Sequence, residues 1–279
     1  MPLEHVNGAN LYFESTGEGV PVVLCHEFAG DMRAWEPQVR YLARRYRVIA
    51  FNYRGYPPSD VPDDPGAYSP DGLVADLLGL LDGLGLDRVH LAGLATGGNL
   101  VLNFAIAHPA RVRSLVVAGA GAGTVDRSAW LEAAGRFADD IARDGSEGIV
   151  ANVADAPQRV IFRTKDPRGW QEFVDGMRRL SPAGAEHVMR EVLIPRAPVF
   201  ALAEGIRRLA MPILVMCGDR DGPASEPSRF IRDTAPHAGL AVVPMCGHTL
   251  NSEEPDLFNR IAGSFLAAVD AGRWGTWRA

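Results

Sequence analysis

The chain has 279 residues, of which 47% are hydrophobic, and its formal net charge is −6 at pH 7. This length and composition support one large core, or one core with a small insertion. The negative balance without any basic run argues against nucleic acid as a partner, and no apolar stretch approaches the roughly 20 residues that span a bilayer. Because the first residues lack the apolar segment of a secretory signal, we expect a cytoplasmic protein that does not bind membranes.

Six apolar runs of strand length alternate with helical segments along the chain. The predicted strands cover 20–26, 46–52, 87–93, 112–120, 212–218 and 239–245. The predicted helices lie near 32–45, 70–84, 96–108, 226–234 and 254–271. Continuously apolar strands separated by helices are typical of a mostly parallel, doubly wound sheet, so the predicted fold class is α/β.

Residues 121–208 break this alternation, because they show helical periodicity without strands. The helical segments cover 127–143, 146–154, 168–180, 182–192 and 198–208. A helical block inserted between two strands is expected to wall the site at the carboxyl ends of the strands. We therefore predict a core formed by 1–120 and 209–279 and a helical lid formed by 121–208. Within the lid, the segment around Lys165 is predicted to be an exposed loop.

The turn after the third predicted strand reads Gly93-Leu94-Ala95-Thr96-Gly97 and is followed by Gly98. This is the frame of a nucleophile elbow, a strand-to-helix turn whose central residue is held in a strained backbone conformation between glycines. The central position usually carries a nucleophile. Here it carries Ala95, whose methyl group cannot form a covalent intermediate.

Four further motifs join the elbow in order, and with them the chain resembles the α/β-hydrolase superfamily over nearly its whole length. An oxyanion-loop motif begins at His26, a turn motif runs from Asn52 to Asp60, and Gly218-Asp219-Arg220-Asp221 and Gly247-His248 follow the last two strands. The resemblance implies an α/β-hydrolase fold with an inserted lid. Neither nucleotide-binding glycine motifs nor metal-ligand spacings occur, so we expect no cofactor and no metal.

The resemblance also implies roles for individual residues. His248 would act as general base and then general acid, and Asp221 would fix its tautomer, with Asp219 and Asp126 left as alternative acids. The backbone N–H groups of Phe28 and Thr96 would form the oxyanion hole.

Two residues of the oxyanion loop and one of the next turn call for comment. His26 is assigned a structural role in supporting the loop. Glu27 stands where the family that the chain resembles usually has glycine. A carboxylate at this position would oppose the negative charge that develops in the oxyanion hole. We expect Glu27 to point away and to pair elsewhere, with an arginine as one candidate. Asn52 stands where the family that the chain resembles has an aspartate, but its side chain can still cap the turn.

Large apolar side chains of the lid are the candidates for substrate contact, although their spacing also fits the lid's own core. The lid is close to neutral, which tolerates an anionic substrate without demanding one. Arg159, Arg163 and Arg168 either pair with a carboxylate or belong to a solvated loop. The substrate-binding candidates are Trp130, Phe137, Phe162, Trp170, Phe173 and Met177, followed by Met189 and Phe200.

Two interpretations of Ala95 remain open. In the one that we favour, alanine has replaced the nucleophilic serine of an active parent, a hydrolase with a Ser-His-Asp triad. That parent would cleave a small or medium carbonyl compound, an ester or lactone before the C–C bond of a diketone. In the other, a natural nucleophile-free protein binds a ligand or uses His248 as the base of a lyase. Both imply a small-molecule partner, and the sequence leaves a homodimer open.

Overall fold

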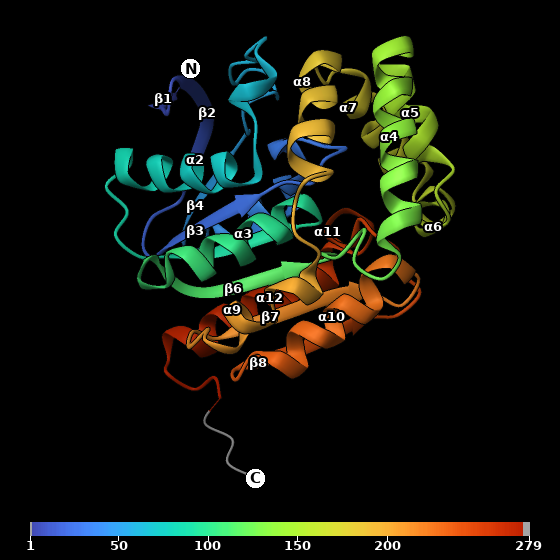
Figure 1. The fold of residues 1–279 in the computed structure, drawn as a ribbon. Coiled ribbons are helices and arrows are strands. Elements are labelled where there is room, and N and C mark those ends of the chain that lie inside the picture. Colours follow the sequence, from blue (N-terminus) through green and yellow to red (C-terminus); the bar gives the residue numbers. More distant parts are fainter. Residues whose placement is uncertain (1, 276–279) are drawn as a thin grey trace.

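The computed structural model describes residues 2–275, in which eight strands form one sheet in the order β1-β2-β4-β3-β5-β6-β7-β8 (Figure 1). The strands from β3 onward pair in parallel, which confirms the predicted α/β class. All six predicted strands are present: β3 (Pro21–Cys25), β4 (Arg47–Phe51), β5 (Val89–Leu94), β6 (Val112–Ala118), β7 (Ile213–Gly218) and β8 (Ala238–Val243). Residues 1 and 276–279 of the predicted core lie outside the described residues.

Two further strands at one edge were not predicted. They are β1 (Leu3–Val6) and β2 (Ala9–Thr16), which form an antiparallel hairpin and join the sheet through β4. Their turn is Asn7-Gly8, with φ of 49° and 78°. An Asn-Gly pair that adopts positive φ is a strong hairpin signal. The two strands were nevertheless not predicted, because only a minority of the residues that flank this turn are apolar and buried.

Helices cover both faces of the sheet (Figure 1), and the buried side chains of β3 to β8 alternate between two clusters, one on each face. In β3, Val23 and Cys25 pack toward α2, α3 and α10, whereas Val22 and Leu24 pack toward α1 and α12. The helices on the first face are α2 (Pro70–Gly83), α3 (Thr96–Ala107) and α10 (Gly222–Thr234). The helices on the second face are α1 (Glu36–Leu42), α11 (Leu250–Glu253) and α12 (Pro255–Asp270). Three short 3-10 helices lie in connections between these elements: η1 (Met32–Trp35), η2 (Pro65–Ala67) and η3 (Pro109–Arg111).

Between β6 and β7 the chain is helical and contains no strand, as predicted. Helices α4 to α8 stand together beyond one end of the sheet (Figure 1). The elements are α4 (Arg127–Asp144), α5 (Ser146–Ala154), α6 (Pro157–Lys165), α7 (Pro167–Arg178), α8 (Pro182–His187), a π-helical turn η4 (Val188–Leu193), η5 (Val199–Leu202) and α9 (Ala203–Arg207). We refer to residues 121–208 as the lid. No helix within residues 2–275 has both the length and the hydropathy needed to cross a bilayer.

The expectation of an exposed loop around Lys165 is wrong, because α6 occupies that segment. Its inner face carries Arg159 and Phe162, both buried. Pro157 at the first turn is a helix-start signal that was available in the sequence.

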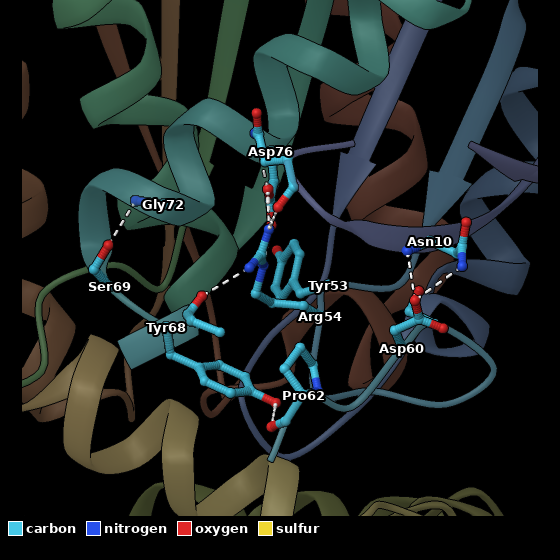
Figure 2. A network of polar contacts seen from close by, with 12 residues as sticks. Asn10, Tyr53, Arg54, Asp60, Pro62, Tyr68, Ser69, Gly72 and Asp76 are labelled. Carbon is cyan, nitrogen blue, oxygen red and sulfur yellow. Dashed lines mark hydrogen bonds and ion pairs between the residues drawn. The ribbon is translucent and has the colours of Figure 1, made fainter. Parts of the chain in front are cut away.

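The turn after β4 is held by side chains rather than by regular secondary structure. Arg54 donates from Nε and Nη2 to the two carboxylate oxygens of Asp76 on α2, at 2.6 and 2.7 Å (Figure 2). Asp60 accepts from the backbone and side-chain nitrogens of Asn10. Asn52 accepts from the Met32 N–H at 2.9 Å and donates to the Pro57 carbonyl at 2.8 Å, so it retains the predicted capping function. These contacts fix the loop that lies beside residues 26–31.

Candidate active site

The turn between β5 and α3 has the backbone of a nucleophile elbow. Ala95 has φ 52° and ψ −106°, a conformation that L-residues rarely adopt. The flanking glycines are required by close approach: a Cβ on Gly93 would lie 2.1 Å from the Gly97 oxygen, and one on Gly97 would lie 2.0 Å from the Cys25 oxygen. The elbow is therefore formed although its central side chain is only a methyl group.

Of the three candidate acids, the structure places Asp221 beside the histidine. His248 Nδ1 lies 2.7 Å from Asp221 Oδ2, and the Asp221 side chain is fully buried. A carboxylate accepts hydrogen bonds, so Nδ1 carries the proton and Nε2 remains the acceptor, as a general base requires. Asp219 instead accepts from the Cys246 N–H at 3.2 Å, and Asp126 caps α4 by accepting from the Ala129 N–H. Neither of these two carboxylates contacts His248.

Two residues that line the same site have backbone N–H groups without an acceptor in the described part of the chain. Neither the Phe28 N–H nor the Thr96 N–H has a hydrogen-bond acceptor within residues 2–275. Both residues line one cavity together with Ala95 and His248. Preorganised N–H groups without an acceptor are what an oxyanion hole requires.

The loop that carries Phe28 is supported by a buried histidine. His26 Nδ1 donates to the Glu27 carbonyl at 2.7 Å, the Tyr53 N–H donates to His26 Nε2 at 3.4 Å, and the His26 and Tyr53 rings stack at 3.9 Å. The Tyr56 hydroxyl donates to the Phe28 carbonyl at 2.9 Å. Burial lowers the pKa of His26 to about 4, so the ring is neutral at pH 7 and acts as a structural element, as expected.

Glu27 pairs with an arginine, and that arginine comes from the lid. Arg159 on α6 donates from Nη1 to Glu27 Oε1 at 3.3 Å and from Nη2 to Oε2, and both side chains are buried. Burial alone would raise the pKa of Glu27, but the Arg159 guanidinium holds it below its usual value. The charge of the Glu27 carboxylate is thus compensated by Arg159, as one of the expected pairings required.

Helix α6 also holds the histidine loop. The Gln158 carbonyl accepts from the His248 N–H at 2.9 Å. Glu253 Oε2 accepts from the Gly247 N–H at 2.9 Å, and Lys165 Nζ lies 3.4 Å from Glu253 Oε1. The segment predicted to be a loop therefore positions the candidate general base.

The cavity at the elbow has a volume of about 310 Å³. This lies at the lower end of the range for small-molecule sites. Of the six lid candidates, Trp130 and Phe137 line it, and so does Met189. Phe162 and Phe173 instead line a separate hollow of about 680 Å³ beside α1, which neither Ala95 nor His248 reaches. Trp170 and Met177 are buried and line neither space, and they belong to the apolar cluster that the lid shares with one face of the sheet.

Several cavity residues were not predicted from the sequence. Asn99, one turn into α3, and Arg196, after η4, both line the cavity, as does Arg159. Of these three residues, only Arg159 was named from the sequence, where it was grouped with Arg163 and Arg168 as a candidate partner for a carboxylate. The role of the three cavity residues depends on tertiary neighbours, for which the sequence carries no spacing signal.

Cys246, two residues before His248, is not activated as a nucleophile. Cys246 is fully buried, and burial raises the pKa of its thiol, which disfavours the thiolate. Within residues 2–275 there is no group of three His, Cys, Asp or Glu side chains that could hold a metal ion.

Comparisons with known proteins agree with this architecture. The chain is 28% identical to "Putative carbamate hydrolase RutD" of Azorhizobium caulinodans, over 97% of this chain and 100% of that protein. It is also 28% identical to "Putative 2-succinyl-6-hydroxy-2,4-cyclohexadiene-1-carboxylate synthase" of Bacillus subtilis, over 89% of this chain and 90% of that protein. Among solved structures, a thermophilic esterase from Thermogutta terrifontis superposes with a TM-score of 0.85 at 25% identity, covering 96% of this chain and 98% of that chain.

A family model decides the assignment. The model described as the alpha/beta hydrolase fold matches residues 20–255, which include the elbow, Asp221 and His248. This span covers most of the chain, from β3 to the start of α12. By this match, and by the fold and elbow geometry described above, the chain belongs to the α/β-hydrolase fold family.

Proposed function

We propose that this site is built to cleave a small ester or lactone by acyl transfer to a serine at position 95, and that with Ala95 the chain binds such a substrate with little turnover. The observation that carries the proposal is the buried Asp221–His248 pair, which opens onto the same cavity as the elbow and two free amide donors. Burying an ionisable pair costs free energy, so a scaffold without proton transfer has no use for it.

The relatives support acyl-transfer chemistry in general. Their names include a carbamate hydrolase and an esterase, and both activities act on a carbonyl carbon bearing a heteroatom. The cavity volume favours a small substrate. Ester or lactone cleavage therefore ranks above cleavage of the C–C bond of a diketone.

With a serine at position 95, each group has a defined task. His248 Nε2 would take the hydroxyl proton as the oxygen adds to the carbonyl carbon, and the Phe28 and Thr96 amides would stabilise the oxyanion. The imidazolium, stabilised by Asp221, would then protonate the departing alkoxide. Water, deprotonated by His248, would hydrolyse the acyl-serine and restore the site. Without the hydroxyl, a residual acceleration of roughly 10³–10⁴ over water is expected, from binding and the oxyanion hole.

The test restores the hydroxyl. Ala95→Ser should create esterase activity on a p-nitrophenyl ester and covalent labelling by an organophosphonate, both measured against the Ala95 chain. The double variant Ala95→Ser/His248→Gln is the matched control and should lose both signals. A folded Ala95→Ser protein with neither activity nor label would contradict the proposal.

The second candidate is nucleophile-free chemistry or ligand binding with His248 as the base. Two observations favour it: Ala95 itself, and the similarity to a relative named as a synthase. If the chain is a lyase, the Ala95 chain would itself turn over a substrate, and His248→Gln would abolish that turnover; if it is a binding module, it would bind its ligand without turnover. Ala95→Ser would then add no esterase activity.

A further inference from the structure

One arginine of the cavity is buried without a carboxylate partner. Arg196 is 9% exposed and lines the cavity together with Thr96, Asn99 and His248. Within residues 2–275 its side chain has one hydrogen-bond acceptor, the Ala122 carbonyl, which lies 2.9 Å from Nη2. A guanidinium has five N–H donors, so most of its hydrogen-bonding capacity is unused.

A second cation lies beside it. The guanidinium carbons of Arg196 and Arg127 lie 5.4 and 4.9 Å from the centre of the Trp130 ring. Arg127 Nη2 donates to the carbonyls of Ile194 and Arg196, and its Nη1 is buried without a partner. Burial, followed by the charge of Arg127, lowers the pKa of Arg196 to about 10, which leaves the Arg196 guanidinium charged at pH 7.

Other arginines of the lid pair with acids. Arg159 pairs with Glu27, Arg178 with Glu147, and Arg190 with Asp139 and Glu186. Within residues 2–275, no ion pair with a carboxylate includes Arg127 or Arg196. Glu27, which also lines the cavity, is already occupied by Arg159. Burying a charge without a counter-ion is costly, so this arrangement is maintained against a free-energy penalty.

We propose that Arg196, flanked by Arg127 and Trp130, is a recognition site for a carboxylate of the substrate, so that the cavity selects small monoesters or lactones that also carry a free carboxylate. The identity of the scissile group rests on the proposed function, whereas the anion site does not. A carboxylate would supply the missing counter-charge and accept from the unused guanidinium donors in the planar, paired geometry that arginine favours. The cationic pair would hold one end of the substrate, and the Phe28 and Thr96 amides would receive the carbonyl oxygen.

The alternative is that Arg196 only fastens the lid. Its bond to Ala122 and the Arg127 bonds to Ile194 and Arg196 join the two chain segments by which the lid leaves the core. A fastening role needs no anion. If Arg196 only fastens the lid, substituting it should change the affinities for neutral and anionic ligands equally. If it binds a carboxylate, the substitution should weaken the binding of anionic ligands more.

The first experiment uses the chain as it exists. Binding of monomethyl succinate, glutarate and adipate is measured by calorimetry and compared with the matched dimethyl esters, which lack the negative charge. We expect at least one monoester to bind on the order of 10- to 100-fold more tightly than its diester, the range of one charge-assisted hydrogen-bonded pair. Equal affinities, or no binding of any monoester, would overturn the proposal without needing a variant.

The second experiment assigns the site. Arg196→Gln should remove the preference for the monoester, and Arg196→Lys should restore only part of it, because an ammonium group cannot form the paired contact. Arg190→Gln is the matched control: it removes an arginine from η4 that pairs with acids outside the cavity, and it should leave the preference intact. Circular dichroism checks that each variant is folded. If Arg196→Gln weakens monoester and diester binding by the same factor, Arg196 only fastens the lid.

The two proposals fail separately. If the monoester binds through Arg196 but Ala95→Ser has no esterase activity, the anion site stands and the proposed function is wrong. If Ala95→Ser cleaves neutral and anionic esters with the same kcat/KM, and Arg196→Gln changes both equally, the proposed function stands and the carboxylate site is wrong.

Discussion

Ala95 occupies a backbone conformation that glycine adopts freely and that costs an L-residue about 1–3 kcal/mol. In an elbow with a hydroxyl, this cost is offset by placing the nucleophile against the base and the oxyanion donors. With a methyl group at position 95, nothing that the side chain does offsets it. The strain is imposed by the surrounding turn, in which the Ala95 N–H donates to the Ala118 carbonyl and its own carbonyl accepts from Asn99.

This strain predicts the effect of a glycine. Ala95→Gly should raise the free energy of unfolding by about 1 kcal/mol, because relief of the positive φ exceeds the entropy cost of glycine. Denaturant unfolding of both proteins measures it. Ala129→Gly, on the exposed face of α4, is the control and should lower stability by about 0.5–1 kcal/mol. If both variants are destabilised alike, the elbow is not strained at position 95.

His26 predicts a pH dependence of stability. Its folded-state pKa is lowered by burial from 6.5 to about 4, so between these values the unfolded chain binds a proton that the folded chain does not. The stabilising contribution is fully present above pH 6.5 and falls by about 3 kcal/mol on acidification to pH 4. Unfolding free energies measured across this range should fall less steeply for His26→Gln. Parallel curves for the two proteins would contradict the assignment.

Which site residues could be predicted depended on whether their role is encoded locally. Asp221, His248, Phe28 and Thr96 each follow a strand end within a motif, and such positions converge at one edge of a parallel sheet. The structure brings these four together at that edge, while their catalytic roles stay a proposal. Arg196 belongs to no motif. It stands out because it is buried without an acidic partner, and this can be recognised only in the folded chain.

At the scale of elements, strands β3 to β8 and the helices that cover them were predicted, because their apolar runs are long and uninterrupted, whereas the more polar β1 and β2 were missed. Helix α6 was missed because it is short and mostly polar, and its inner face uses Arg159 beside Phe162. The choice of lid residues suffered from a related ambiguity. Trp130 and Met177 occupy similar helical faces in the sequence, yet Trp130 lines the cavity and Met177 is buried in the apolar cluster beneath the lid.

The Glu27–Arg159 pair connects the oxyanion loop to α6, and its removal predicts a coupled effect. Arg159→Met should destabilise the fold by about 3–5 kcal/mol, because it leaves a buried carboxylate without its counter-ion. Adding Glu27→Gln should recover most of that loss, since no buried charge remains. Equilibrium unfolding of the single and double variants gives the coupling energy.

A second arginine of the same helix serves as the control. Arg163 pairs with Asp155 at the surface, and Arg163→Met should cost at most about 1 kcal/mol. If Arg159→Met is no more destabilising than Arg163→Met, the buried pair does not hold the loop. If the double variant is as unstable as Arg159→Met alone, the damage comes from lost packing rather than from the unpaired charge.

At the scale of the whole molecule, lid and sheet share one apolar cluster rather than two. Met177 and Val188 of the lid belong to the same buried cluster as Leu91 of β5 and Val117 of β6. The ion pair between Glu27 and Arg159 and the hydrogen bond between His248 and Gln158 cross the same boundary. We therefore expect the lid to unfold with the core, although it is an insertion in the sequence.

Because the cluster is shared, a destabilising substitution in the lid should also lower the stability of the sheet. Met177 is fully buried and does not line the elbow cavity, and Met177→Ala should cost about 2–5 kcal/mol through lost burial and the space that it leaves. If unfolding is cooperative, the most protected amides of α7 and of β6 should exchange faster by the same factor in hydrogen-exchange mass spectrometry. Leu131→Ala, on the exposed side of α4, should change both by less than about 0.5 kcal/mol. Faster exchange confined to α4–α8, with β6 unchanged, would mean that the lid opens as a separate unit and that its packing against the sheet does not couple the two.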